Sequence, residues 1–236
     1  MARVSGAQKN ALDAYFSLMT TRPQLFINRR QRPIIKERAV LEAHCIDQNL
    51  TLGVAATTPH FYFLVDLVAS RGTNGEPFYH PYMRVVQREQ LEGAVNVAIL
   101  GTIEEPALGR RGDIVLLRQE RHATGSTEVE IPRGFGNPGV AGEVNALREL
   151  EEETGYKGET AELLGSLFID TGLTDGEVHF YHIRITGRAH QHPEPEEAIS
   201  GIRLLSPDTI WNEIRSGRIR DSFTLQALAL YEKHAA

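Results

Sequence analysis

The chain has 236 residues, with 25 Lys and Arg against 31 Asp and Glu, a formal net charge of −6 and one cysteine, Cys45. Hydrophobic residues make up 41% and charged residues 24%, which excludes the disordered, collagen-like and disulfide-rich classes. The mild acidity argues against a protein that coats DNA or RNA, because that work needs clustered Lys and Arg. A lone cysteine also excludes an internal disulfide and a multi-cysteine zinc site.

Targeting signals are not evident in the sequence. Residues 1–20 contain no apolar run after a basic start, as a secretory signal would. The longest apolar stretches, such as residues 61–65, are far shorter than a membrane span. We therefore expect a cytoplasmic protein whose partners include neither membrane nor nucleic acid.

The first ninety residues combine helical and strand-like patterns. Ser5 is placed to cap a helix over residues 6–19, and a second helix is expected over residues 34–46. Two runs rich in aromatic and β-branched residues, 60–70 and 78–89, flank an Asn-Gly turn signal, so they predict a β-hairpin.

From about residue 93 the pattern changes to short strands with helices between and after them. Mixed elements without strict alternation predict an α+β domain with a mixed sheet. We accordingly divide the chain into an N-terminal extension with helices and a β-hairpin, residues 1–92, and a main domain, residues 93–236. The expected strands are 95–100, 113–119, 128–132, 163–169, 178–185 and 199–205, and the closing helices are 207–216 and 222–234.

A glycine-rich loop followed by an acidic helix carries the chemical signal. Residues 143–154 are helix-forming, and Gly155 stands where a helix C-cap belongs. At about 100° per residue, Glu149, Glu152 and Glu153 share one face of this helix. Such a face is either simply solvated or a site for a hard cation such as Mg²⁺, which bridges a diphosphate and activates water.

The same segment resembles the Nudix box, the loop–helix–loop of enzymes that hydrolyse nucleoside diphosphates linked to another group. The resemblance rests on Gly134 and on the segment Arg148-Glu149-Leu150-x-Glu152-Glu153-x-Gly155-Tyr156. It implies a Nudix-type α/β/α sandwich, with Glu149 and Glu153 as metal ligands and Glu152 as a further ligand or the base. Arg148 would orient Glu149 or Glu152 by an ion pair. The box departs from the family at Val140, where a glutamate is expected.

Further segments resemble the ADP-ribose pyrophosphatases within that family. Residues 117–121 and 130–134 are similar to their Gln-Tyr-Arg and Glu-x-Pro-Ala-Gly segments, with Arg133 in place of the alanine. This implies substrate contacts for Arg121 and Glu130, and a metal contact through the backbone carbonyl of Arg133. The acidic run 194–197 resembles a loop whose glutamate assists water activation, which makes Glu197, or failing it Glu196, the candidate base. The resemblance also implies a homodimer.

Two functional hypotheses follow. The first is an Mg²⁺-dependent hydrolase, with Mn²⁺ as a possible substitute, that cleaves ADP-ribose or a related nucleotide-sugar to a nucleoside monophosphate and a sugar phosphate. The second is a domain that binds such a nucleotide without turnover, as a sensor or interaction module. The intact glutamate set favours the first, and Val140 favours the second. The His190-Gln191-His192 run and the basic run 29–32 are interpreted as exposed polar segments.

Overall fold

The computed structural model describes residues 3–28, 32–193 and 197–235. Glu196 and most of the basic run, residues 29–31, therefore lie outside the described residues. The chain forms two compact units, Met1–Arg88 with Asp170–Gly176, and Glu89–Ile169 with Glu177–Ala236. The segment 170–176 follows a strand of the second unit in sequence but packs in the first, which the sequence did not indicate. A domain boundary at residue 92 stays a prediction.

The first unit is built around an antiparallel sheet in the order β1–β2–β3. The expected N-cap is present, because the Ser5 hydroxyl accepts from the Gln8 N–H while the Gln8 side chain accepts from the Ser5 N–H. The expected hairpin is also present, with β2 and β3 paired along their whole length. The elements are α1 (Gly6–Thr21), η1 (Pro23–Phe26), α2 (Arg38–Gln48), β1 (Gly53–Thr57), β2 (Phe61–Arg71) and β3 (Pro77–Gln87).

The second predicted helix begins later than expected. The α2 helix starts at Arg38 instead of residue 34. The preceding residues run beside β2 instead, where the Ile35 N–H donates to the Leu67 carbonyl and the Pro33 carbonyl accepts from the Ala69 N–H. Pairing with a strand edge thus overrides the helical spacing of the apolar residues. The short strand β1 was not predicted.

The second unit is a mixed sheet with helices on both faces. Its central order is β12–β5–β4–β10–β9, in which β4 and β10 are parallel and the other neighbours are antiparallel. The elements are η2 (Gln90–Glu92), β4 (Asn96–Ile103), β5 (Ile114–Arg121), β6 (Ser126–Glu130), β7 (Arg133–Gly134), α3 (Gly142–Thr154), β8 (Tyr156–Lys157), β9 (Ala161–Phe168), β10 (Glu177–Ile185), β11 (Gly187–Arg188), β12 (Ile199–Leu205), α4 (Pro207–Arg215) and α5 (Ser222–Ala235).

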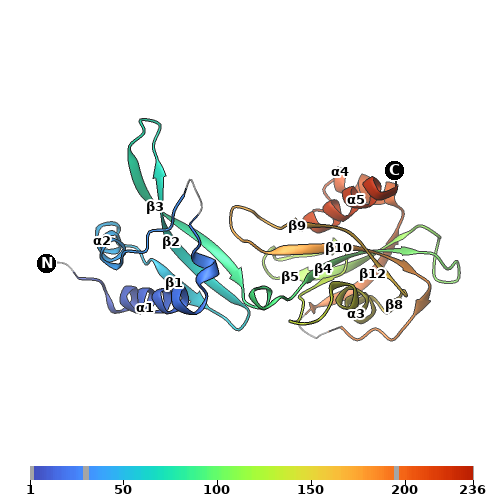
Figure 1. Ribbon diagram of the computed structural model, residues 1–236. Helices are drawn as coiled ribbons and strands as arrows, with labels where there is room; N and C mark the ends of the chain where they lie inside the picture. The colour runs from blue at the N-terminus through green and yellow to red at the C-terminus, as the bar shows by residue number, and fades with distance from the viewer. Residues whose placement is uncertain (1–2, 29–31, 194–196, 236) are drawn as a thin grey trace. The chain divides into compact units, whose positions relative to one another are not determined.

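Strand β4 shows how the layers are assembled. Every residue of β4 is buried, as expected for a strand covered on both faces. Ala98 and Leu100 belong to the apolar cluster that includes α5, whereas Val97 and Ile99 belong to the cluster that includes α3. Figure 1 shows α3 on one side of this sheet and α4 and α5 on the other. The predicted α+β class, with a mixed sheet between helical layers, is therefore confirmed.

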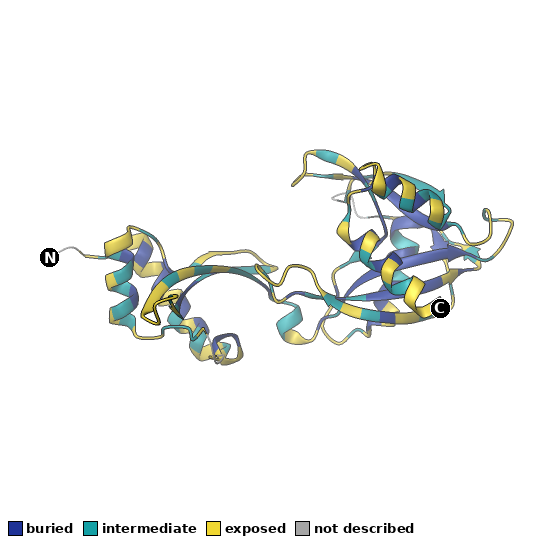
Figure 2. Ribbon diagram, turned by 90° about the horizontal axis from the view of Figure 1, so that it is seen from above, coloured by how far each residue is buried: buried dark blue, intermediate teal, exposed yellow. Residues whose placement is uncertain are grey.

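Burial follows the same layering in the second unit. Figure 2 shows its central strands as buried and the outward faces of its helices as exposed. The predicted helix end at Gly155 is also present, with a φ of 66° and its N–H donating to the Glu151 carbonyl at 2.8 Å. None of the helices in the described ranges is long and apolar enough to cross a bilayer.

Candidate active site

The α3 helix presents Glu149 and Glu153 toward the sheet, one helical turn apart. Glu149 is 6% exposed and Glu153 is 2% exposed. Gly134, on β7, lies against the Glu149 carboxylate so closely that a Cβ there would overlap it. The Arg133 N–H next to it donates to Glu153 Oε2 at 3.1 Å. The first glycine of the box is thus where the backbone has to pass the helix carboxylates.

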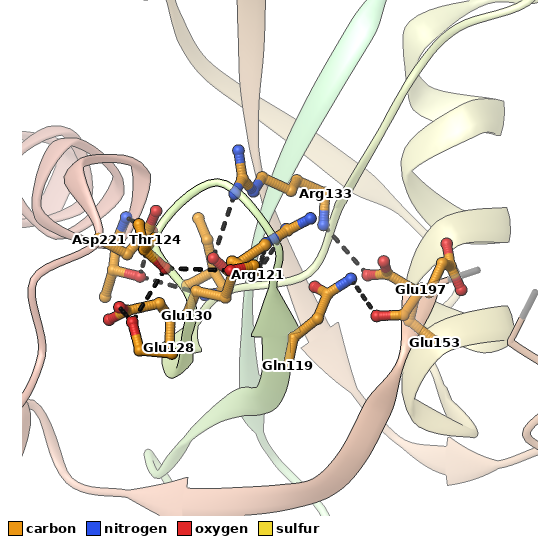
Figure 3. A network of polar contacts seen from close by, with 12 residues as sticks. Gln119, Arg121, Thr124, Glu128, Glu130, Arg133, Glu153, Glu197 and Asp221 are labelled. Atoms are coloured by element: carbon orange, nitrogen blue, oxygen red, sulfur yellow. Dashed lines mark hydrogen bonds and ion pairs between the residues drawn. The ribbon is translucent and has the colours of Figure 1, made fainter. Parts of the chain in front are cut away.

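Glu197, from the loop before β12, joins these two glutamates. Carboxylate oxygens of Glu149, Glu153 and Glu197 all lie within 4.8 Å of one another. Gln119 of β5, itself buried, donates from Nε2 to the Glu197 backbone carbonyl at 2.6 Å. Figure 3 shows Gln119 beside Glu153 and Glu197. Residues 44 positions apart in the sequence are therefore brought into one carboxylate group, which we call the acidic group.

The acidic group carries unfavourable negative charge. Burial raises the pKa of Glu149 to about 7, and the charges of Glu152 and Glu197 add to this rise while Arg148 opposes it. Burial, followed by the charges of Glu197 and Glu149, raises the pKa of Glu153 to about 9, partly offset by the Arg133 N–H. Buried carboxylates that repel one another take up either protons or a cation.

Arg148 connects the acidic group to Glu152. Its guanidinium contacts the carboxylates of both Glu149 and Glu152. It is also held by Asn145, whose Oδ1 accepts from Arg148 Nη2 at 2.7 Å. Glu152 itself lies outside the acidic group, with its carboxylate on Arg148 and a more distant His192 at 3.9 Å. Of the three helix glutamates, the structure therefore brings only Glu149 and Glu153 together with Glu197.

A second charged cluster lies beside the acidic group. Glu130 is 1% exposed, and its Oε1 binds Arg121 while its Oε2 accepts from Arg133 Nη2 at 3.1 Å. Figure 3 shows Arg121 and Glu130 on the side of Gln119 away from Glu197. The charge of Arg121 lowers the pKa of Glu153, opposing the larger effect of burial. The two residues expected to bind substrate are therefore paired with each other next to the acidic group.

The segment after β11 closes the end of α3. Gln191 Nε2 donates to the Glu153 carbonyl at 2.6 Å, and the His192 N–H donates to the Glu152 carbonyl at 3.0 Å. The His190-Gln191-His192 run is exposed, as expected. It nevertheless satisfies carbonyl groups that the end of a helix leaves without intrahelical partners. This contact holds the chain a few residues before Glu197.

Sequence reasoning assigned no role to two residues that hold the site, Asn145 and Gln119. Asn145 stands three residues before Arg148, a spacing at which helix side chains meet. Gln119 stands two residues before Arg121, within the segment that resembled Gln-Tyr-Arg. Val140 offers Arg148 no acceptor, and the side chain that holds Arg148 is Asn145.

The glycine loop, the acidic helix and the mixed sheet between helices can now be compared with known proteins. The NUDIX domain matches residues 96–225, so the chain belongs to the Nudix family. The solved structure of an ADP compounds hydrolase superposes with a TM-score of 0.60, covering 86% of this chain and 94% of that one. At 16% sequence identity, that likeness is one of fold.

Curated relatives share parts of the sequence. An ADP-sugar pyrophosphatase of Mus musculus is 41% identical over 85 residues, 35% of this chain and 39% of that protein. A methanol dehydrogenase activator of Bacillus methanolicus is 33% identical over 129 residues, 54% of this chain and 70% of that protein. An ADP-ribose pyrophosphatase of Bacillus subtilis is 34% identical over 101 residues, 43% of this chain and 51% of that protein. The predicted resemblance to the Nudix family, and to its ADP-ribose pyrophosphatase-like branch, is confirmed.

Proposed function

We propose that the protein is a Nudix pyrophosphohydrolase that cleaves ADP-ribose, or a related nucleotide-sugar, to a nucleoside monophosphate and a sugar phosphate. The observation that carries the proposal is the acidic group, in which three carboxylates from α3 and a distant loop converge within 4.8 Å. The pyrophosphatases of Mus musculus and Bacillus subtilis support this substrate class.

The donor set of the acidic group fits a hard divalent cation. All of its side-chain donors are carboxylate oxygens, the ligands that Mg²⁺ prefers, and Mn²⁺ accepts the same donors. Burial, with repulsion between the carboxylates, raises the pKa values of Glu149 and Glu153, and a bound cation would favour their ionised forms. Glu149 and Glu153 would hold the cation, with the backbone carbonyl of Arg133 as a further donor. When bound, the cation offsets phosphoryl charge and makes water more acidic.

The remaining residues then have distinct tasks. Glu197 is only partly buried and stands on a loop, so its carboxylate can meet the attacking water and take its proton. Glu152 is the alternative base, although its carboxylate is engaged by Arg148. Arg148 keeps Glu149 in place, and Arg121, oriented by Glu130, binds the substrate. Glu196, the other candidate base, lies outside the described residues.

A product-release assay tests the proposal directly. ADP-ribose, other nucleotide-sugars and dinucleotides are incubated with Mg²⁺ or Mn²⁺, and the nucleoside monophosphate is measured. Glu153→Gln should lose both cation binding, measured by calorimetry, and turnover. Glu197→Gln should weaken cation binding less than Glu153→Gln does, while kcat falls by about 10²-fold or more. Glu151→Gln, on the same helix but outside the acidic group, is the matched control.

Val140 supports a second candidate, a domain that binds a nucleotide without hydrolysing it. A valine offers no acceptor where the Nudix box has a glutamate. If none of the substrates turns over with either cation while ADP-ribose still raises the melting temperature, this second function replaces the first. Turnover of any of them, abolished by Glu153→Gln, excludes it.

Assembly and location stay predictions from the sequence. A homodimer is implied by the resemblance to ADP-ribose pyrophosphatases, and sedimentation of the purified protein tests it. A cytoplasmic location is an expectation from the sequence, and fractionation of cells tests it.

A further inference from the structure

The backbone and the side chain of Arg133 face two different charged groups. The Arg133 N–H donates to Glu153 Oε2 at 3.1 Å, so the backbone borders the acidic group. The guanidinium turns to Glu130, where Nη2 donates to Oε2 at 3.1 Å, and its central carbon lies 4.3 Å from the centre of the Phe223 ring. Figure 3 shows the hydrogen bonds of Arg133 to Glu153 and to Glu130 as dashed lines. Arg133 therefore borders the acidic group through its backbone, while its guanidinium lies in the neighbouring cluster with Glu130.

The positive charge of Arg133 exceeds what Glu130 needs. Arg121 approaches Glu130 Oε1 with both Nε, at 2.8 Å, and Nη2. That paired approach already neutralises a single carboxylate, because two charge-assisted contacts come from one guanidinium. Arg133 contributes a second guanidinium to the same carboxylate through Nη2. The cluster of Arg121, Glu130 and Arg133 thus has one positive charge left over.

Protein contacts do not use the whole Arg133 side chain. Its Nε is buried and has no hydrogen-bond partner among the residues that the structure describes, and 27% of the side chain stays exposed. A buried donor without a partner is costly, and a bound water, a bound ion or a functional role are among the explanations for one. The planar guanidinium matches the geometry of phosphate oxygens, and the Phe223 ring beneath it limits its movement. The segment that Arg133 belongs to resembles one that has alanine at this position, so the resemblance assigns no role to the Arg133 side chain.

We propose that the Arg133 guanidinium binds a phosphoryl oxygen of the substrate diphosphate. The inference rests on the proposed function, because the acidic group beside Arg133 is where the diphosphate would lie. Arg133 then has two separate roles, a backbone contact at the acidic group and a side-chain contact with the substrate. Only the second is removed by substitution of its side chain.

Binding of ADP-ribose to the full chain in the presence of a chelator tests this contact without any turnover. Loss of one charge-assisted contact should weaken binding by about tenfold or more in Arg133→Gln, measured by calorimetry. Arg133→Lys keeps the charge but not the planar guanidinium, so its affinity for ADP-ribose should lie between those of wild type and Arg133→Gln. Arg220→Gln is the matched control, because Arg220 also holds a buried glutamate, Glu128, at 2.6 Å through one Nη2. It should bind like wild type.

Steady-state kinetics with Mg²⁺ give the second readout. Arg133→Gln should raise KM for ADP-ribose by about tenfold while kcat changes by less than about threefold, as expected for a contact made in ground and transition states alike. Equal affinity of Arg133→Gln and wild type in chelator overturns the inference, as does a wild type that does not bind ADP-ribose there. Weakened binding in Arg133→Gln, with a wild type that hydrolyses nothing, upholds the inference and removes the proposed function.

Discussion

Asn145 Oδ1 accepts a hydrogen bond of 2.7 Å from Nη2 of Arg148, three residues later on the same helix. Asn145 Nδ2 lies 3.3 Å from the carbonyl oxygens of both Val95 and Phe135, which belong to the segments before β4 and α3. The buried Asn145 amide therefore ties the arginine to two backbone segments. Val140 can make no such bond, so the chain has an anchor for Arg148 at a position that the Nudix box does not specify.

Asn145→Ala should lower activity more than its effect on folding explains. The substitution removes the acceptor of a charged donor, which costs about 1–3 kcal/mol, and it also removes the hydrogen bonds from Asn145 Nδ2 to two backbone carbonyls. We expect kcat/KM for ADP-ribose to fall by about 10- to 100-fold, because Arg148 no longer holds Glu149 in place. Asn145→Asp keeps the acceptor and should retain more activity than Asn145→Ala.

Asn212→Ala is the control for this substitution. Asn212 Oδ1 accepts from Arg215 Nη1 at 3.0 Å with the same three-residue spacing, but on the exposed side of α4. Such surface pairs contribute little to stability, so activity and melting temperature should stay near those of wild type. An Asn145→Ala variant with the kcat/KM of wild type would contradict the anchoring role.

Gly134→Ala should disrupt the acidic group by steric overlap alone, because Gly134 does not have a positive φ. A Cβ at Gly134 would overlap the Glu149 carboxylate, so the carboxylate or β7 has to move. We expect the affinity for Mn²⁺, measured by calorimetry, to fall by about tenfold or more, since a displaced ligand weakens a site of fixed geometry. Gly201→Ala, where a Cβ meets no atom within 4 Å, is the control and should bind Mn²⁺ like wild type.

Gly134 and Asn145 show which parts of the site could be predicted from the sequence and which could not. Gly134 and the glutamates of α3 were found because their order along one segment is fixed, and local spacing also gave the hairpin and the end of α3. Asn145 was missed because its value comes from carbonyls of two other segments, which only the fold brings near. Helix spacing likewise could not separate Glu152 from Glu149 and Glu153, because the separation depends on Arg148 and the position of Glu197.

Thr224→Val should destabilise the junction between β6 and α5. The buried Thr224 hydroxyl accepts from the Ile131 N–H at 3.1 Å and donates to Asp221 at 2.8 Å. Valine keeps the volume but leaves the Ile131 N–H unpaired, which costs about 1–3 kcal/mol. Chemical denaturation measures this loss. Thr20→Val removes only an exposed hydroxyl contact to the Phe16 carbonyl, so a similar loss there would show that the effect is not specific to the junction.

The metal-free protein should lose stability as the pH rises from about 5 to 9. The pKa values of Glu149 and Glu153 are raised in the folded protein to about 7 and about 9, from an ordinary value of 4.5. Between these limits the folded state binds more protons than the unfolded state, so a rise in pH favours unfolding. A divalent cation binds the ionised carboxylates, so the increase in melting temperature caused by Mg²⁺ should grow with pH.

Melting curves with chelator and with Mg²⁺, recorded across this pH range, measure both effects. Glu153→Gln removes the group with the larger rise in pKa, so its metal-free melting temperature should depend less on pH than that of wild type. Glu151→Gln should keep the wild-type slope, because Glu151 is not part of the acidic group. A metal-free melting temperature that increases over this range, or a Mg²⁺ effect that shrinks with pH, would mean that the carboxylates of α3 are not held as buried, mutually repelling ligands.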